Sequence, residues 1–328
     1  MSEFQTAAMG DEWGPVKVIQ VRHPDGLTGI LVIDNVAVGP AIGGLRIAPD
    51  VTAQECFRLA RAMTLKNVSA GLRHGGGKSV IAADPAMPPA DKERIIRIFA
   101  HALRNETDYI FGPDMGTDEG CMAWVHDEIG RAVGLPEEFG GIPLDELGAT
   151  GWGVRHAAQV ACEQQGIPLA GATVAVQGFG AVGYHSARFL AQAGAVLVAA
   201  SDSGAAVINP AGIDVDALRR HKRETGALAA FPGARTATRD AILSVACDLW
   251  IPAARPDVIR AEHVDRFQGR IMVQGANIPV TGEAEQRLYD RGVLCVPDFI
   301  ANAGGVICAA LEYTGATRTT AFAAIEER

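Results

Sequence analysis

Two lysines and one aspartate in the first half of the chain have the residue types needed to move protons at a small polar substrate. Lys78 follows three glycines in HGGGKSV, Lys66 lies in MTLKN, and Asp114 lies in GPDMGT. Glycines allow close backbone approach and leave the lysine amine unhindered. With Lys66 nearby, desolvation and like-charge repulsion would lower the pKa of Lys78 toward neutrality, which makes Lys78 a candidate general base. One lysine could then bind a carboxylate while the other moves protons.

Each of these residues also has a simpler explanation. HGGGKSV resembles the end of a Walker A loop, G-x-x-x-x-G-K-[ST], but the first glycine of that loop is due at position 72, where the chain has Leu72. Lys66 continues the apolar stripe of a helix, and its stem could carry the amine out to the helix end. Asp114 could be a turn former in a loop that contains glycine and proline.

The second half of the chain has the pattern of a dinucleotide-binding turn. Gly178, Gly180 and Gly183 fit G-x-G-x-x-G between a predicted strand, GATVAVQ, and a predicted helix, YHSARFLAQAG. Asp202 ends the next predicted strand, where a carboxylate can bind the adenosine ribose and favours NAD. The two serines beside it could accept a 2′-phosphate, so NADP stays open. A tight turn that binds no ligand is the alternative.

The elements that would position these residues indicate two α/β domains. A hairpin over 16–38, a helix that begins with the capping box Thr52–Glu55, and a helix over 91–104 come first. A Gly- and Pro-rich stretch over 134–151 separates them from alternating strands and helices. We therefore expect a substrate-binding and oligomerisation domain (1–140), a Rossmann NAD-binding domain (148–300), and a C-terminal helical segment (301–328) that packs back at the domain interface.

Composition narrows the classes of function. The net charge of −9 argues against a nucleic-acid or anionic-membrane partner. The six cysteines form no C-x-x-C pair and the eight histidines no H-E-x-x-H motif, so neither a disulfide framework nor a metal site is indicated. The N-terminal segment MSEFQTAAMGDEWGP has no apolar run, and no later stretch has the length of a membrane span, so we expect a cytoplasmic protein.

Eight motifs, in order, give the chain a resemblance to the glutamate, leucine, phenylalanine and valine dehydrogenase family. They are GPAIGGLR (39–46), MTLKN (63–67), GGGKSV (75–80), GPDMGT (112–117), ATGWGV (149–154), VQGFGAVG (176–183), QGANIPVT (274–281) and PDFIANAGGV (297–306). The resemblance implies a substrate domain, a Rossmann domain and a cleft between them. It also implies reversible oxidative deamination of an L-amino acid to a 2-oxo acid and ammonia, with hydride passing to NAD(P).

The same resemblance implies a role for each matching residue. Lys66 would bind the substrate α-carboxylate, Lys78 would be the base that activates water on the imine, and Asp114 would exchange protons with the substrate nitrogen. Further substrate contacts are implied for Ile42, Gly43, Gly44, Asn302, Val306 and Ala309. Cofactor contacts are implied for Thr150, Gly178, Gly180, Ala181, Val182, Gly183, Asp202 and Asn277.

Two departures from the family pattern bear on the substrate. Glutamate-specific members have a lysine where this chain has Ile42, and a serine where it has Ala309. Burying a substrate carboxylate beside these apolar residues would cost several kcal/mol, so we expect an NAD-dependent dehydrogenase of a hydrophobic amino acid similar to Leu, Val or Phe. We also expect a homo-oligomer. The alternatives are a glutamate dehydrogenase that uses Arg46 or Arg73 for the distal carboxylate, and a non-catalytic NAD-binding regulatory protein.

Overall fold

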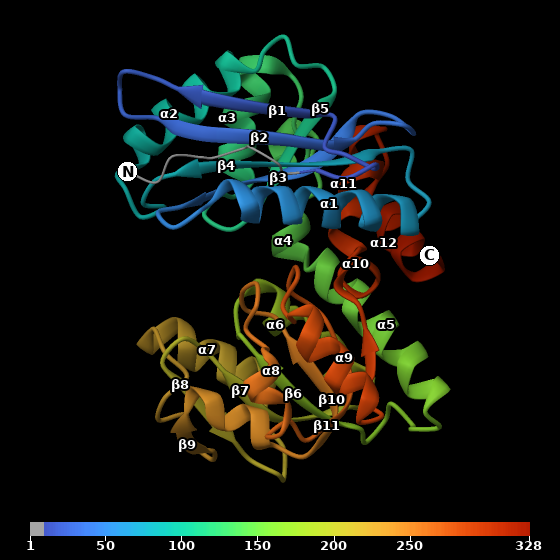
Figure 1. The fold of residues 1–328 in the computed structure, drawn as a ribbon. Helices are drawn as coiled ribbons and strands as arrows, with labels where there is room; N and C mark the ends of the chain where they lie inside the picture. The colour runs from blue at the N-terminus through green and yellow to red at the C-terminus, as the bar shows by residue number, and fades with distance from the viewer. Residues whose placement is uncertain (1–9) are drawn as a thin grey trace. The chain divides into compact units, whose positions relative to one another are not determined.

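A computed structural model describes residues 10–328, and the contacts within it divide the chain into two compact units (Figure 1). The first unit runs to Leu144 and also contains Val306–Ala324 and Arg328, while the second comprises Asp145–Gly305 and Ile325–Glu327. Much of the C-terminal segment that we set apart at 301–328 thus belongs to the first unit by its contacts. Residues 1–9 of the N-terminal segment MSEFQTAAMGDEWGP lie outside the described residues.

The first unit is built on a five-stranded mixed sheet in the order β1-β2-β4-β3-β5. The predicted hairpin is confirmed, since β1 and β2 pair antiparallel on either side of the turn at residues 23–27. Strand β4 lies between β2, to which it is antiparallel, and β3, to which it is parallel, and β3 also pairs parallel with β5. The strands are β1 (Lys17–Arg22), β2 (Thr28–Asn35), β3 (Ala41–Ala48), β4 (Gly75–Ala82) and β5 (Tyr109–Pro113).

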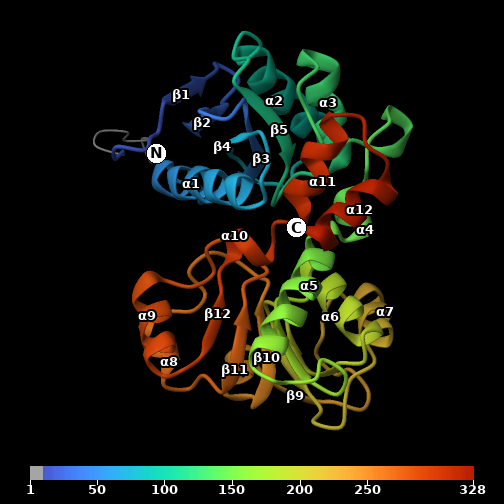
Figure 2. The ribbon, with the colours of Figure 1, turned by 90° about the vertical axis from the view of Figure 1, so that its right-hand side faces the viewer.

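Helices cover both faces of this sheet (Figures 1 and 2). Helix α1 (Ala53–Ser69) packs on one face through Cys56 and Ala60, and its N-terminus is capped by Thr52 as the sequence predicts. On the other face lie α2 (Pro89–Ala102) and α3 (Glu119–Ile129). The remaining elements that involve this unit are η1 (Glu137–Phe139), α4 (Leu144–Leu147), α11 (Gly304–Tyr313) and α12 (Arg318–Glu327).

The second unit has a seven-stranded sheet in the order β12-β11-β10-β6-β7-β8-β9. Its first five strands are parallel, and β8 and β9 add an antiparallel edge. The chain leaves β6 toward β7 and later returns to β10 on the other side of β6, so the order reverses at β6, where this fold class binds dinucleotides. The strands are β6 (Thr173–Gln177), β7 (Val196–Ser201), β8 (Ala205–Ile208), β9 (Arg235–Thr238), β10 (Cys247–Pro252), β11 (Gly269–Val273) and β12 (Leu294–Val296).

The sheet of the second unit is covered on both faces, which confirms the doubly wound prediction (Figure 2). One face packs against α5 (Ala149–Gln164), α6 (Ala181–Gln192) and α7 (Val215–Thr225). The other packs against η2 (Arg239–Ser244), α8 (Ala261–Val264) and α9 (Gly282–Asp290). The short helix α10 (Asp298–Ala301) follows β12. Because both faces are buried, the central strands contain unbroken apolar runs such as residues 174–176 of β6 and 249–251 of β10, and these do not alternate with polar residues.

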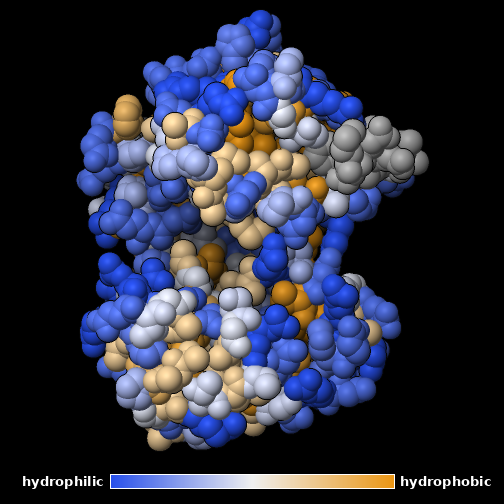
Figure 3. Space-filling view, turned by 90° about the vertical axis from the view of Figure 1, so that its left-hand side faces the viewer, coloured by the Kyte–Doolittle hydropathy of each residue, from blue (hydrophilic) through white to orange (hydrophobic). Residues whose placement is uncertain are grey.

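On the face drawn in Figure 3, hydrophilic residues prevail and hydrophobic ones form scattered patches. Within residues 10–328, no helix has the length and apolar character required to cross a bilayer. All six cysteines are free thiols, and five of them are buried.

Candidate active site and dinucleotide site

The three glycines before Lys78 lie inside strand β4, where each allows a close contact. A Cβ on Gly75 would sit 1.7 Å from the carbonyl oxygen of Asn35, and one on Gly76 would sit 2.0 Å from the amide nitrogen of Thr64 in α1. A Cβ on Gly77 would meet the ring of Tyr109 at 2.9 Å. The stretch is therefore a tightly packed strand and no phosphate loop, so the Walker A interpretation of HGGGKSV is wrong.

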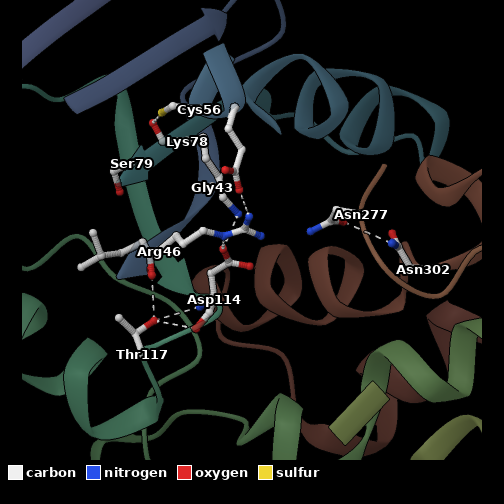
Figure 4. A network of polar contacts seen from close by, with 12 residues as sticks. Gly43, Arg46, Cys56, Lys78, Ser79, Asp114, Thr117, Asn277 and Asn302 are labelled. Carbon is white, nitrogen blue, oxygen red and sulfur yellow. Dashed lines mark hydrogen bonds and ion pairs between the residues drawn. The ribbon is translucent and has the colours of Figure 1, made fainter. Parts of the chain in front are cut away.

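Lys78 points from β4 toward the end of β5 (Figure 4), and its side chain is only 2% exposed. Its Nζ lies 3.0 Å from Oδ2 of Asp114, the residue that follows β5. Gly44 on the neighbouring strand β3 leaves room for this pair, since a Cβ there would lie 2.7 Å from Cβ of Asp114 and 3.0 Å from Nζ of Lys78. The structure thus brings the predicted base and the predicted proton-exchanging carboxylate into direct contact.

Arg46, also on β3, is the second cation at this carboxylate. Its Nε donates to Oδ2 of Asp114 at 2.7 Å, and its Nη1 binds Glu55 in the first turn of α1. The guanidinium is buried, with 4% of the side chain exposed. Ile42, Gly44 and Arg46 share one face of β3 because side chains alternate along a strand.

The loop after β5 holds Asp114 by local hydrogen bonds. The backbone N–H of Asp114 donates to Oγ1 of Thr117 at 2.9 Å, and this hydroxyl donates to the carbonyl oxygen of Leu45 at 2.8 Å. Gly116 has a φ of +84°, and a Cβ there would meet the carbonyl oxygen of Ile47 at 2.1 Å. Hydrogen bonds and Gly116 therefore fix the turn formed by the GPDMGT motif. The Asp114 carboxylate is directed toward Lys78 and Arg46, which turn formation alone does not explain.

Burial and the neighbouring charges shift the pKa values of Lys78 and Asp114 downward. Burial is the main effect that lowers the pKa of Lys78, and the charge of Arg46 adds to it, while Asp114 opposes them. Burial acts to raise the pKa of Asp114, but Lys78 and Arg46 outweigh it and hold this pKa well below its usual range. The like charge that we expected from Lys66 is thus supplied by Arg46.

The other predicted substrate residues of the first unit are also placed by the structure. Lys66 lies in the last turn of α1 and is buried, so its amine does not reach solvent as the simpler explanation required. Ile42 on β3 and Ala309 on α11 are buried as well. Gly43 must be glycine for packing, since a Cβ there would lie 1.8 Å from the carbonyl oxygen of Gly77. Val306 lies on α11 and is half-buried.

In the second unit, the glycine motif forms the turn between β6 and α6. Gly178 has a φ of +91°, and a Cβ on Gly183 would lie 1.9 Å from the carbonyl oxygen of Gly178. Gly180, the N-cap of α6, has no atom within 4 Å of an added Cβ and makes no side-chain cap. Ala181 and Val182 begin the helix. An open space before an uncapped helix N-terminus fits the pyrophosphate of a dinucleotide.

Asp202 follows β7, as predicted, and its carboxylate accepts three backbone hydrogen bonds. Oδ1 accepts from Gly204 and Ala205 at 2.9 and 3.0 Å, and Oδ2 accepts from Leu228 at 2.8 Å. Burial acts to raise the pKa of Asp202, but these donors lower it overall, so the group carries its charge. Lys222 of α7 donates to the carbonyl oxygen of Phe179 at 3.0 Å and adds a positive charge near Asp202.

Asn277 and Asn302 meet at the carboxyl end of the second sheet (Figure 4). Nδ2 of Asn302 donates to Oδ1 of Asn277 and to the carbonyl oxygen of Gly275, both at 3.2 Å. Thr150 lies in the first turn of α5, and a Cβ on Gly305 would sit 2.7 Å from its Oγ1. Two predicted cofactor residues, Thr150 and Asn277, and the predicted substrate residue Asn302 thus all belong to the second unit.

Sequence reasoning missed the residues that support the central pair. Arg46 was considered only as a ligand for a distal carboxylate, and Glu55 only as part of a capping box. The even spacing of Arg46 from Ile42 could have indicated Arg46 if a strand had been predicted over residues 41–48, because residues at even spacing share one face of a strand. Glu55 gave no signal, because its contact with Arg46 joins a helix to a strand and depends on the tertiary fold.

Comparison with known proteins places both units in one family. Residues 15–131 match the family model described as Glu/Leu/Phe/Val dehydrogenase, dimerisation domain, and residues 140–327 match the model described as Glutamate/Leucine/Phenylalanine/Valine dehydrogenase. The chain is 38% identical to an NADP(+)-dependent glutamate dehydrogenase of Pyrobaculum calidifontis over 91% of this chain and 77% of that protein. It is 37% identical to the NAD-specific glutamate dehydrogenase A of Halobacterium salinarum over 91% and 73%.

A solved structure shows the same fold. The hetero-hexameric glutamate dehydrogenase of Thermus thermophilus, in a form with bound leucine, superposes with a TM-score of 0.87 and 28% identity over 95% of this chain and 82% of that chain. The matched models span both units and include the buried Lys78–Asp114 pair and the glycine turn. The chain therefore belongs to the Glu/Leu/Phe/Val dehydrogenase family and is an amino acid dehydrogenase that uses NAD or NADP.

Proposed function

We propose that the protein catalyses reversible oxidative deamination of an L-amino acid through Lys78 and Asp114. The observation that carries this proposal is the buried contact between Nζ of Lys78 and Oδ2 of Asp114 at 3.0 Å, beside Arg46. A buried lysine whose pKa is lowered can accept a proton near neutral pH, as a general base must. A purely structural ion pair would not require a lysine whose pKa is lowered by burial.

In this proposal each residue of the first unit has one task. Neutral Lys78 accepts a proton from the water that attacks the substrate imine. Asp114 exchanges a proton with the substrate nitrogen, and Lys66 pairs with the α-carboxylate and fixes its orientation. These roles fit the burial of both lysines, because a charged or reacting group is stabilised most strongly where water is excluded.

The dinucleotide would be held by residues of the second unit. Gly178, Gly180 and Gly183 with the N-terminus of α6 would bind the pyrophosphate, and Asp202 would bind the adenosine ribose. Thr150 and Asn277 would contact the nicotinamide end. When bound, the dinucleotide would supply the acceptor for the hydride that leaves the substrate Cα. A cofactor-binding regulatory protein with no turnover has less support, because it would not need the buried pair of the first unit.

Two candidates remain for the side chain of the substrate. The names of the relatives support glutamate better than a hydrophobic amino acid. Ile42 and Ala309 support a hydrophobic one, because both are apolar and buried and the family resemblance implies a lysine and a serine at these positions in glutamate-specific members. Arg46 is a poor substitute for that partner, since it is already bound to Asp114 and Glu55. Arg73 is exposed.

We expect kcat/KM for leucine, valine, methionine or phenylalanine to exceed that for glutamate by at least tenfold, about 1.4 kcal/mol. The reason is the cost of burying an unpaired carboxylate beside Ile42 and Ala309. Initial rates of NADH formation with a panel of L-amino acids measure this. The double variant Ile42→Lys/Ala309→Ser is the matched control and should move preference toward glutamate. Glutamate as the best substrate of the unaltered protein would instead establish the second candidate.

We expect NAD to be the better coenzyme by kcat/KM, because the charged carboxylate of Asp202 would repel a 2′-phosphate. The positive charge of Lys222 would attract a 2′-phosphate, so Lys222→Ala should increase the preference for NAD further. Steady-state rates and fluorescence titrations with both reduced coenzymes measure the two effects. Equal or better use of NADP by the unaltered protein would show that Lys222 and the serines beside Asp202 outweigh its charge.

The assembly and location remain parts of the proposal. We propose a homo-oligomer, which the match of residues 15–131 to a dimerisation domain supports. Its partners would be the amino acid, the 2-oxo acid and ammonia, with no nucleic acid or membrane. The cytoplasmic location stays a prediction from the sequence.

A further inference from the structure

We infer that Arg46, anchored by Glu55, is a positioning residue that fixes Asp114 and acts through its charge on Lys78. The inference rests on the proposed function. In it, Arg46 orients the Asp114 carboxylate and does not bind the side chain of the substrate. Its basis is a continuous chain of contacts from α1 through β3 to the end of β5, in which the side chains of Arg46 and Lys78 are buried (Figure 4).

The geometry makes Arg46 and Lys78 share one carboxylate oxygen. Oδ2 of Asp114 lies 2.7 Å from Nε of Arg46 and 3.0 Å from Nζ of Lys78. A guanidinium does not lose its proton in proteins, so Arg46 stays a fixed cation. Asp114 therefore has a permanent partner and does not depend on Lys78 for neutralisation. Lys78 can give up its proton without leaving a buried carboxylate unpaired.

Glu55 limits the effect of this fixed charge. It binds the other end of the guanidinium from the first turn of α1. Without Glu55, more of the positive charge of Arg46 would act on Lys78 and Asp114. The two residues should therefore affect the protonation of Lys78 in opposite directions, which a merely structural pair would not do.

The other groups around Lys78 do not supply this control. The thiol of Cys56 on α1 donates to the backbone carbonyl of Lys78 at 3.3 Å, and burial raises its pKa to about 12, so it stays neutral. The hydroxyl of Tyr109 on β5 is bound to the carbonyl oxygen of Gly43 at 2.8 Å, and burial raises its pKa well above the usual value. Lys66 on α1 is the remaining buried cation of the predicted site.

The chain permits a direct measurement, because it has only five lysines: Lys17, Lys66, Lys78, Lys92 and Lys222. Protein labelled with ¹³C-lysine gives five Cε signals, and the signal that disappears in Lys78→Arg is that of Lys78. Its titration can then be followed without substrate. Arg46→Gln should raise the pKa of Lys78 by about one unit, and Glu55→Gln should lower it.

Two further variants serve as controls. Arg46→Lys keeps the charge and should leave the Lys78 titration closer to that of the unaltered protein than Arg46→Gln does. Arg97→Gln removes a surface arginine paired with Glu93 and should leave it unchanged. Thermal melting checks that each variant folds. If Arg46→Gln does not fold, Glu55→Gln and Arg46→Lys decide the question.

Shifts of the same sign in Arg46→Gln and Glu55→Gln, or no shift in either, would overturn the inference. Because the titration uses no substrate, its outcome is independent of the proposed function. If the pKa of Lys78 shifts in opposite directions in the two variants but the protein has no activity on any amino acid, the effect of Arg46 on Lys78 stands and the proposed reaction is wrong. If the protein is active but the pKa of Lys78 does not shift, the proposed reaction stands and Arg46 is not a positioning residue.

Discussion

Replacement of Lys78 by alanine is expected to reduce kcat by roughly 10²- to 10⁴-fold, the loss typical of a missing general base, while the affinity for NADH stays nearly unchanged. Lys78 is buried in β4 of the first unit, whereas the glycine turn that fits a dinucleotide belongs to the second. Steady-state kinetics and a fluorescence titration with NADH measure the two quantities on one sample.

Lys66→Ala is the matched comparison, since both lysines are buried in the same unit. Loss of the partner of the α-carboxylate should mainly raise the KM for the amino acid, with a smaller loss in kcat if orientation suffers. Weak NADH binding together with near-normal turnover at saturation in Lys78→Ala would contradict the assignment and make Lys78 a nucleotide ligand after all.

The pH dependence of the unaltered enzyme should follow from the same residue. A base must be unprotonated to act, so kcat should be lost as the pH falls through the pKa of Lys78 in the enzyme–substrate complex. Burial and Arg46 lower that pKa, so activity should persist to a lower pH than an ordinary lysine would allow.

Two glycine variants are expected to separate folding from ligand binding in the second unit. Gly183→Ala places a Cβ 1.9 Å from the carbonyl oxygen of Gly178, so we expect a destabilisation of about 1–3 kcal/mol and loss of NADH binding. Gly180→Ala meets no atom within 4 Å, so its melting temperature should stay close to that of the unaltered protein. Its methyl group would nevertheless occupy the space expected for the pyrophosphate, and NADH affinity should fall at least tenfold, about 1.4 kcal/mol.

Gly282→Ala is the control for Gly180→Ala, because it also begins a helix of the second unit and also meets no atom within 4 Å. It should change neither the melting temperature nor the NADH affinity. Thermal melting and fluorescence titration of the three variants measure both properties. Unchanged NADH affinity in Gly180→Ala would support the tight turn that binds no ligand and count against the dinucleotide site.

Local sequence patterns were sufficient for several of the elements and for naming candidate site residues. The capping box placed the start of α1, and the strand–glycine–helix pattern placed the turn between β6 and α6. These signals depend on residues close together in the chain, where propensity and spacing decide the conformation. The motifs also identified Lys78 and Asp114 as candidates.

Only the tertiary structure decided how those residues act on one another. Three glycines before a lysine look the same in a phosphate loop and in a strand, and the contacts of Gly75 and Gly76 with distant backbone atoms distinguish the two. The partner of Lys78 is 36 residues away and the cation that shares it is on a third segment. Such contacts arise from sheet order and helix packing, which no local spacing encodes, and they set the burial and charge on which the chemistry depends.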